Sequence, residues 1–285
     1  MKLIKPSVEI IKQEKYDLNH IFKFIELAGR TCYKSEDKIT EDSAKEFVDR
    51  MIKSGHGAML EHGTVYLKMV GDESISNKYK NNPYSKVILE YPKNNVPNIY
   101  CIPTHHITTN YRVLVENNWL NDLQYICEYT NFHEKRTTVK FICDRGISHE
   151  FVRHRVFSFA QESTRYCNYT KDKFNNELTF IIPCWIKDLE EGNYYAYCEY
   201  HHSKNDASKR WFDICMCTEF VYTNLIEKGW KPQEARTILP NSLKTELIMT
   251  GFDFDWQHFF ELRCAPNAHP QAKELADMLK DKFNK

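Results

Sequence analysis

The 285-residue sequence predicts a single α+β domain. Segments with helical spacing of apolar residues and segments with strand-like alternation follow one another without the regular strand–helix–strand order of a parallel α/β sheet. The length alone also permits two domains, but no repeat, low-complexity tract or linker divides the chain. Hydrophobic residues make up 42%, which excludes a disordered chain.

The first predicted elements are a helix and a strand in the N-terminal third. Apolar residues recur at helical spacing over 40–54, where Thr40 can cap the helix and Gly55 can end it. Strict alternation then predicts a strand over 64–70. The polar stretch of about 70–104, which is rich in Asn, Lys and Pro, predicts a surface excursion with short strands.

The remaining elements alternate irregularly between the two types. Residues 110–131 have helical spacing that is broken near 117–118, and the long apolar stripe of 206–227 predicts the longest helix. Further helices are predicted over 147–155, 232–238, 255–263 and 271–283. Branched and aromatic residues predict strands over 137–143 and 178–182, and 243–250 fits a strand better than a helix.

The charge balance excludes several classes of protein. Lys and Arg number 39, as do Asp and Glu, so the chain lacks the positive excess of a general nucleic-acid or polybasic membrane binder. No apolar run approaches the roughly 18 residues of a membrane span. The N-terminus has no secretory signal and the ten cysteines form no C-x-x-C pair, so we expect reduced, mostly buried thiols in a cytoplasmic protein.

Motifs for common cofactor sites are absent from the sequence. Neither G-x-G-x-x-G nor a P-loop occurs, and the near match to H-E-x-x-H at 149–154 misplaces its second histidine by one residue. The pairs His105-His106 and His201-His202 have no partners at ligand spacing, so we interpret them as surface histidines. No metal site is predicted.

Basic residues concentrate between positions 145 and 165, where four arginines stand against two glutamates. Consecutive side chains of Arg153-His154-Arg155 point in different directions and can therefore contact different groups. Gln161, Ser163 and Arg165 would share one side of an extended loop. Guanidinium groups suit phosphates and flat rings, and a glutamine amide suits a pyrimidine edge. The alternative is a solvated basic helix end without a ligand.

These residues resemble the motifs of the flavin-dependent thymidylate synthases. Arg153-His154-Arg155 followed after seven residues by Ser163 matches the R-H-R-x7-S signature, and the chain continues Thr164-Arg165-Tyr166 as the family does. Three further motifs occur in the family's order, from residue 54 to residue 263: Ser54-Gly55-His56 with Glu61-His62, Arg236-x-x-Leu239-Pro240, and Phe259-Phe260-x-Leu262-Arg263.

The resemblance implies a reductive methylation and the site for it. In this family dUMP becomes dTMP, methylenetetrahydrofolate gives the one-carbon unit and NADPH supplies reducing equivalents through FAD. The implied fold is a central, mostly antiparallel sheet flanked by helices, in a homotetramer with active sites at subunit interfaces. The implied FAD contacts are His56, Glu61, Arg153, His154, Arg155 and Ser158. The implied dUMP contacts are Glu150, Gln161, Ser163, Arg165, Arg236 and Arg263, with Ser163 and Arg165 expected in the catalytic centre.

One segment departs from the family pattern. Many members carry an Asn and an Arg that contact FAD just before the last motif, whereas residues 250–258 here are rich in aromatic side chains. We expect His258 to act as a polar or stacking partner of FAD in their place. Two other classes stay open: a nucleotide- or RNA-binding regulator without catalysis, and a flavoprotein of unrelated redox function.

Overall fold

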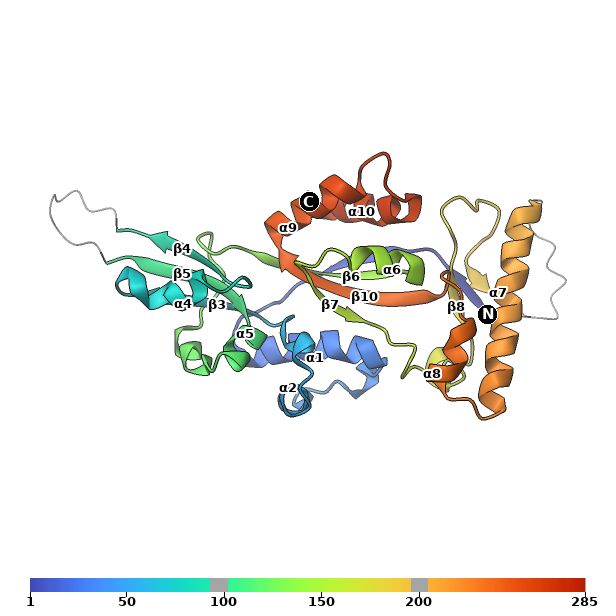
Figure 1. The fold of residues 1–285 in the computed structure, drawn as a ribbon, viewed down its shortest axis with the longest axis horizontal. Helices are drawn as coiled ribbons and strands as arrows, with labels where there is room; N and C mark the ends of the chain where they lie inside the picture. The colour runs from blue at the N-terminus through green and yellow to red at the C-terminus, as the bar shows by residue number, and fades with distance from the viewer. Residues whose placement is uncertain (93–101, 196–204, 285) are drawn as a thin grey trace.

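The computed structural model describes residues 1–92, 102–195 and 205–284. The molecule is elongated, with one small sheet at one end and the long helix α7 at the other (Figure 1). Within these residues the strands form one four-stranded and two three-stranded sheets, with orders β2-β6-β10-β7, β8-β1-β9 and β3-β5-β4. The predicted α+β class is confirmed, and every pair is antiparallel except β1 with β8.

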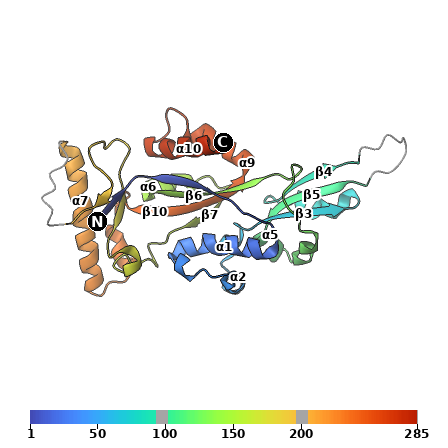
Figure 2. The same ribbon diagram turned by 180° about the vertical axis from the view of Figure 1, so that it is seen from behind.

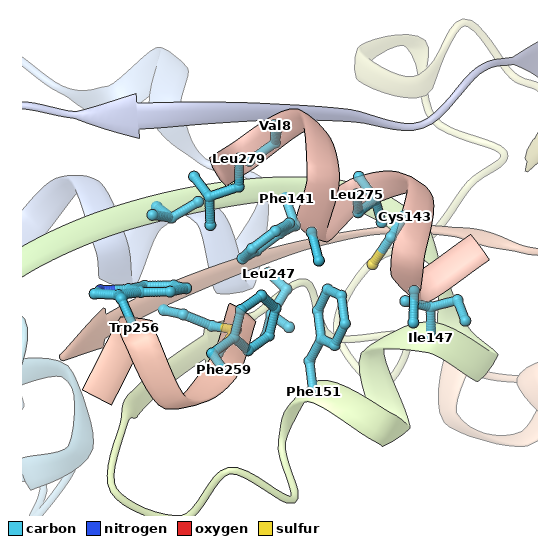
Figure 3. Packing of buried hydrophobic residues seen from close by; sticks show 14 of the residues in the cluster. Val8, Phe141, Cys143, Ile147, Phe151, Leu247, Trp256, Phe259, Leu275 and Leu279 are labelled. Carbon is cyan, nitrogen blue, oxygen red and sulfur yellow. The ribbon is translucent and has the colours of Figure 1, made fainter. Parts of the chain in front are cut away.

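The four-stranded sheet carries the main core. Its strands are β2 (Ser7–Ile11), β6 (Arg136–Asp144), β10 (Lys244–Phe252) and β7 (Ser158–Gln161). Alternate residues of β6, such as Phe141 and Cys143, point to one face and pack against three helices. These are α6 (Arg145–Phe151), α9 (Asp253–Arg263) and α10 (Pro270–Phe283). Figure 3 shows Phe141, Phe151, Trp256 and Phe259 meeting between the sheet and these helices.

The opposite face of this sheet is covered by α1 (Leu18–Tyr33), as both ribbon views show (Figures 1 and 2). Ala28 of α1 packs there against Ala160 and Ile248. Helices α2 (Ser43–Lys53) and α3 (Gly57–Leu60) follow α1. They share a core with the sheet formed by β3 (Thr64–Val70), β4 (Lys86–Glu90) and β5 (Thr104–Asn110), and with α4 (Asn77–Lys80) and α5 (Tyr111–Glu116).

A third core lies at the α7 end. Strands β1 (Lys2–Ile4), β8 (Thr179–Ile181) and β9 (Gly192–Asn193) pack there with α7 (Asp206–Glu227). Helix α8 (Pro232–Ala235) continues into a short 3₁₀ turn, Arg236–Ile238, and this connection leads into β10. No helix in the part of the chain that the structure describes is long and apolar enough to cross a membrane.

The sequence predicted most of the long elements but missed the 16-residue helix α1 and the strand β5, along with several short elements. The strand over 64–70 and the helix over 206–227 are confirmed at both ends, and 243–250 is a strand. The first predicted helix begins at Ser43, with Asp42 and not Thr40 at the cap position, and the Asp42 side chain makes no capping hydrogen bond. Residues 110–131 divide into α5 and a 3₁₀ turn, Leu120–Tyr125. The 70–104 stretch contains α4, β4 and the fully buried Tyr79.

Three predictions about side chains and local geometry are wrong. The helix after β6 ends at Phe151 and not at Arg155. Only Gln161 of the 161–165 segment is extended, since Ser163 and Arg165 lie in a turn. His105 and His106 are buried in β5, where His105 contacts Ser76 and His106 contacts Glu90. The second pair, His201-His202, lies outside the described residues.

A buried histidine joins two of the sheets. The Nδ1 atom of His62, just before β3, lies 2.8 Å from Thr250 Oγ1 of β10, which lies 2.7 Å from Thr138 Oγ1 of β6. His62 is fully buried, and burial, with the nearby charge of Arg136, lowers its pKa to about 3. Protonation therefore favours the unfolded chain, whose histidines titrate near pH 6.5. The unfolding free energy that neutral His62 contributes is fully present above pH 6.5 and is lost progressively as the pH falls from 6.5 toward 3.

We predict that acidification from pH 7.5 to 5 removes about 2 kcal/mol of unfolding free energy through His62. The His62→Asn variant should lack this component, whatever its stability at pH 7.5. Urea unfolding at the two pH values measures the difference. The exposed His149 provides the matched control, because His149→Asn should keep the wild-type pH dependence. An unchanged pH dependence in His62→Asn would contradict the assignment.

Candidate active site

The loop after α6 is fixed at both ends. Asp144 Oδ1 accepts the backbone N–H of Ile147 at 2.8 Å and so starts α6 at the end of β6. The helix ends at the buried Phe151, and the chain then turns until Phe157. The Phe157 ring lies against Gly251 so closely that a Cβ atom there would overlap it. This contact between the loop and β10 requires glycine at position 251.

The loop separates its three basic residues. Arg153 and Arg155 are exposed, and no carboxylate of the described residues pairs with either of them. His154 instead packs against Phe259, with 5.1 Å between ring centroids. Burial, reinforced by the charges of Arg263 and His258, lowers the pKa of His154 to about 4, so its imidazole is neutral at pH 7. The prediction that the triplet diverges is confirmed.

Arg263, at the end of α9, connects this loop to α6. Its Nε donates to His154 Nε2 at 2.9 Å, Nη1 to the Glu150 carboxylate at 2.6 Å and Nη2 to the Glu150 carbonyl at 2.8 Å. The structure thus brings together Glu150, His154 and Arg263 from distant parts of the sequence. His258 lies on the same helix but is exposed and faces Glu261, with 3.4 Å between Nδ1 and Oε2.

A cavity of about 290 Å³, which we name the cationic pocket, lies beside Arg155 and Ser158. Its cationic residues come from three segments: Lys86 from β4, Arg136 from the start of β6, and Arg155 from the loop. The rest of the lining consists of Pro83, Tyr84, Asn110, Val156, Ser158, Gly251, Phe252, Phe254 and Asp255.

Arg136 organises the inner wall of the cationic pocket. Its Nη1 donates to the Glu61 carbonyl and to Thr64 Oγ1, both at 3.1 Å, and Nη2 lies 3.5 Å from Ser158 Oγ. Glu61 itself pairs with Arg112 and lines a neighbouring cavity of about 250 Å³ that shares Tyr84 and Asn110 with the first. His56 is exposed at the start of α3 and lines neither cavity.

Sequence reasoning missed Lys86 and Arg136. Lys86 belongs to the stretch that we interpreted as an excursion, and Arg136 directly precedes the predicted strand over 137–143. Neither residue belongs to a motif. Only the position of a cation at a predicted strand end could have singled out Arg136.

The turn after β7 holds the remaining candidates. The Ser163 N–H donates to the Cys32 carbonyl at 3.0 Å, and Ser163 Oγ accepts the Arg165 N–H at 3.3 Å. Arg165 is exposed, and its Nε lies 3.4 Å from Oε1 of Gln233 in α8. Arg236 follows Gln233 by three residues and therefore lies on the same side of that helical segment. Ser163, Arg165 and Arg236 thus form one patch.

Gln161 links this patch to α6. Its Nε2 lies 2.8 Å from Ser148 Oγ and 3.3 Å from Thr245 Oγ1. Beneath the turn, Glu162 accepts from Lys244 at 2.9 Å and from the Tyr169 hydroxyl at 3.0 Å. Because Glu162 is buried between the half-buried Gln161 and Ser163, its contacts help to position the two flanking residues.

The ion pair continues into a buried network around Glu246. The carboxylate of Glu246 contacts Lys244, Lys34 and Lys140 at 2.6, 2.8 and 2.6 Å. Burial alone would raise its pKa, but the three ammonium groups hold that pKa well below its usual range. The network is therefore ionised at neutral pH, and beneath the turn it connects β6 and β10 with the residues that directly follow α1 and β7.

The candidate residues form three groups in this chain. Arg155, Ser158 and Glu61 lie at or next to the cationic pocket; Glu150, His154 and Arg263 form the cluster between α6 and α9; and Ser163, Arg165 and Arg236 lie next to α8. The guanidinium groups of the first and third groups have no carboxylate partner among the described residues and can bind phosphates. No described residue places an imidazole or carboxylate in hydrogen-bond contact with Ser163 Oγ, so its hydroxyl lacks a base.

Comparison with known proteins assigns the chain that carries these three groups to one protein family. The profile of the thymidylate synthase complementing protein family matches residues 109–285. A flavin-dependent thymidylate synthase from Pyrococcus furiosus is 33% identical over 134 residues, which cover 47% of this chain and 48% of that protein. One from Corynebacterium aurimucosum is 22% identical over 258 residues, covering 88% of this chain and 71% of that protein.

The chain spans about half the length of the first of these curated relatives. Among solved structures, a UMP/dUMP methylase, PolB, from Streptomyces cacaoi with bound 5-Br dUMP is 17% identical. That alignment covers 99% of this chain and 92% of the other, with a TM-score of 0.44. The profile match includes the loop of Arg153–Arg155, the turn of Ser163 and both Arg236 and Arg263. The chain belongs to the thymidylate synthase complementing protein family.

Proposed function

We propose that this protein is a flavin-dependent thymidylate synthase, a methyltransferase that converts dUMP to dTMP. Methylenetetrahydrofolate would donate the one-carbon unit, and NADPH would be the reductant through FAD. The observation that carries the proposal is that exposed arginines without a carboxylate partner among the described residues gather at the family-matched loop and turn, with the cationic pocket beside the loop. Relatives that bear this activity in their names support it.

The residues present fit FAD. Its pyrophosphate is an anion, and Arg153 and Arg155 are exposed cations without carboxylate partners among the described residues. Ser158 contributes a hydroxyl beside Arg155, and Glu61 and His56 extend the surface toward α3. When bound, FAD would supply the redox chemistry of the reaction. Residues of this chain would bind and orient it: His56, Glu61, Arg153, His154, Arg155, Ser158 and His258.

His154 and His258 would act differently from the arginines. His154 faces Arg263, so we assign it to orienting the loop whose neighbouring arginines contact the cofactor. His258 is exposed, and Glu261 is its one hydrogen-bond partner among the described residues, so its ring can approach a bound ligand. The family's Asn and Arg contacts have no counterpart in 250–258, where Phe252 and Phe254 line the cationic pocket instead.

The dUMP site would use the turn after β7. Arg165 and Arg236 would bind the phosphate, and Gln161, held by Ser148, would orient the pyrimidine edge. Ser163 would donate its hydroxyl to the nucleotide and not act as a nucleophile, since it lacks a base. Glu150 and Arg263 form an ion pair with each other and would complete the nucleotide contacts.

We also propose that the site is shared between subunits of a homotetramer. Glu150 and Arg263 lie between α6 and α9, whereas Arg165 and Arg236 lie next to α8. Figure 1 shows α8 well apart from α9. A second copy that brings one group against the other would unite them. In this proposal the chain is a single catalytic domain in the cytoplasm, and the four-stranded sheet is the counterpart of the family's central sheet.

The decisive experiment is hydrogen release from dUMP labelled on its uracil ring, with FAD, NADPH and methylenetetrahydrofolate present. We predict release that depends on all three, because the methyl group replaces that hydrogen. Binding of FAD without dUMP affinity would instead indicate an unrelated flavoprotein. Polynucleotide binding with a steep salt dependence and no release would indicate a regulator.

A second prediction separates the nucleotide contacts from the cofactor contacts. Ser163→Ala and Arg165→Lys should each raise the apparent dissociation constant for dUMP about tenfold, because each removes a hydrogen bond to a charged or polar group of the nucleotide. FAD should stay bound in both variants. Titration of dUMP and flavin absorbance of the purified proteins measure the two effects. Equal loss of both ligands would show that the two sites are not distinct.

A third prediction concerns Arg153, one of the two exposed arginines of the loop. Arg153→Ala should weaken FAD retention about tenfold, because no described residue pairs with its guanidinium, which is therefore available to a phosphate. The flavin-to-protein ratio after gel filtration measures retention. Arg210→Ala, on the far surface of α7, is the control and should retain the wild-type ratio. A wild-type flavin content in Arg153→Ala would reject its role.

A further inference from the structure

The cationic pocket contains two positive side chains that no sequence motif marks. Lys86 and Arg136 line it beside Arg155, and none of these three forms an ion pair with a carboxylate of the described residues. Lys86 lies outside residues 109–285, the region that matches the family. It comes from β4, within the 70–104 stretch.

Aromatic rings hold these two cations in place of carboxylates. Phe252 and Phe254 stack with their centroids 5.4 Å apart and their planes at 11°. Lys86 Nζ lies 5.3 Å from the Phe254 centroid and 5.8 Å from that of Phe252, and Arg136 Cζ lies 5.6 Å from Phe252. Contact with a ring face positions a cation without neutralising it. Both groups therefore stay able to bind an anion.

The charge of the pocket is also unbalanced. Among the described residues that line it, Asp255 is the only acidic one, against Lys86, Arg136 and Arg155. The excess is two positive charges when Asp255 is ionised, and burial raises the pKa of Asp255. A diester pyrophosphate carries two negative charges at neutral pH. The volume of about 290 Å³ accommodates such a group with part of an attached nucleoside.

We propose that Lys86 and Arg136, together with Arg155, bind the pyrophosphate of FAD in the cationic pocket. This inference rests on the proposed function, which places FAD beside Arg155 and Ser158. It gives the 70–104 stretch a role, because β4 of that stretch supplies a cofactor ligand. It also explains how aromatic residues at 252 and 254 serve a flavin site: they position the cations that contact the phosphates.

The experiment compares FAD binding by apo-protein variants, measured as quenching of flavin fluorescence. Lys86→Ala should raise the FAD dissociation constant about tenfold, and Lys86→Glu should raise it further, because each removes a charge-assisted contact to phosphate. Lys86→Arg keeps the charge and should stay within about threefold of wild type. Lys80→Ala is the matched control, because Lys80 is an exposed lysine of the same stretch that lies outside the pocket.

Arg136 needs a readout of folding as well, since it contacts Glu61 and Thr64. Arg136→Gln should weaken FAD binding about tenfold while the apo-protein keeps a cooperative urea unfolding transition. If Arg136→Gln does not fold, the Lys86 variants alone test the pyrophosphate assignment.

The outcomes distinguish this inference from the function on which it rests. Suppose that the wild-type protein binds FAD and that Lys86→Ala and Lys86→Glu have the same FAD dissociation constant as Lys80→Ala. This result would overturn the pyrophosphate assignment and leave the proposed function standing. Wild-type protein that binds no FAD would overturn both. Weakening by Lys86→Glu and Lys86→Ala with rescue by Lys86→Arg supports the assignment.

Discussion

The pairing of β6 with β10 is the constraint on which the other groups depend. The two strands align over nine residues, from Lys244 opposite Asp144 to Phe252 opposite Arg136. One end of this ladder places Arg136, Gly251 and Phe252 at the cationic pocket. The other end holds the start of α6 and the lysine that pairs with Glu162. A one-residue slip would turn every side chain to the opposite face and separate these contacts.

The two faces of the sheet have different roles. The α9 and α10 face is filled with aromatic rings, and such packing tolerates little displacement of α9 (Figure 3). Arg263, at the end of that helix, is therefore held where it meets Glu150 and His154. The α1 face holds the ionised network around Glu246, which beneath the Ser163 turn connects β6 and β10 with the residues that directly follow α1 and β7. Rigid packing on one face and buried charge on the other position the loop and the turn.

Local sequence patterns predicted most of the long elements, although not the helix α1, and they failed where contacts distant in sequence decide. The apolar stripe of α7 and the alternation of β3 gave correct boundaries because each pattern is complete within its own segment. His105 and His106 can be buried because Ser76 and Glu90 supply their hydrogen-bond partners. The polarity of the two histidines alone does not predict these distant partners. Motifs identified Arg155 and Ser158, whereas Lys86 and Arg136 join them only through strand pairing and packing.

The contact between Arg263 and His154 also determines which ring nitrogen of His154 carries the proton. The Nε of an arginine side chain always carries hydrogen, so His154 Nε2 must accept at 2.9 Å and cannot be protonated in this arrangement. A neutral imidazole then carries its single hydrogen on Nδ1. The loop therefore presents one defined tautomer, whose Nδ1–H is a donor of fixed direction over the whole pH range in which the ring stays neutral. That range extends down to about pH 4.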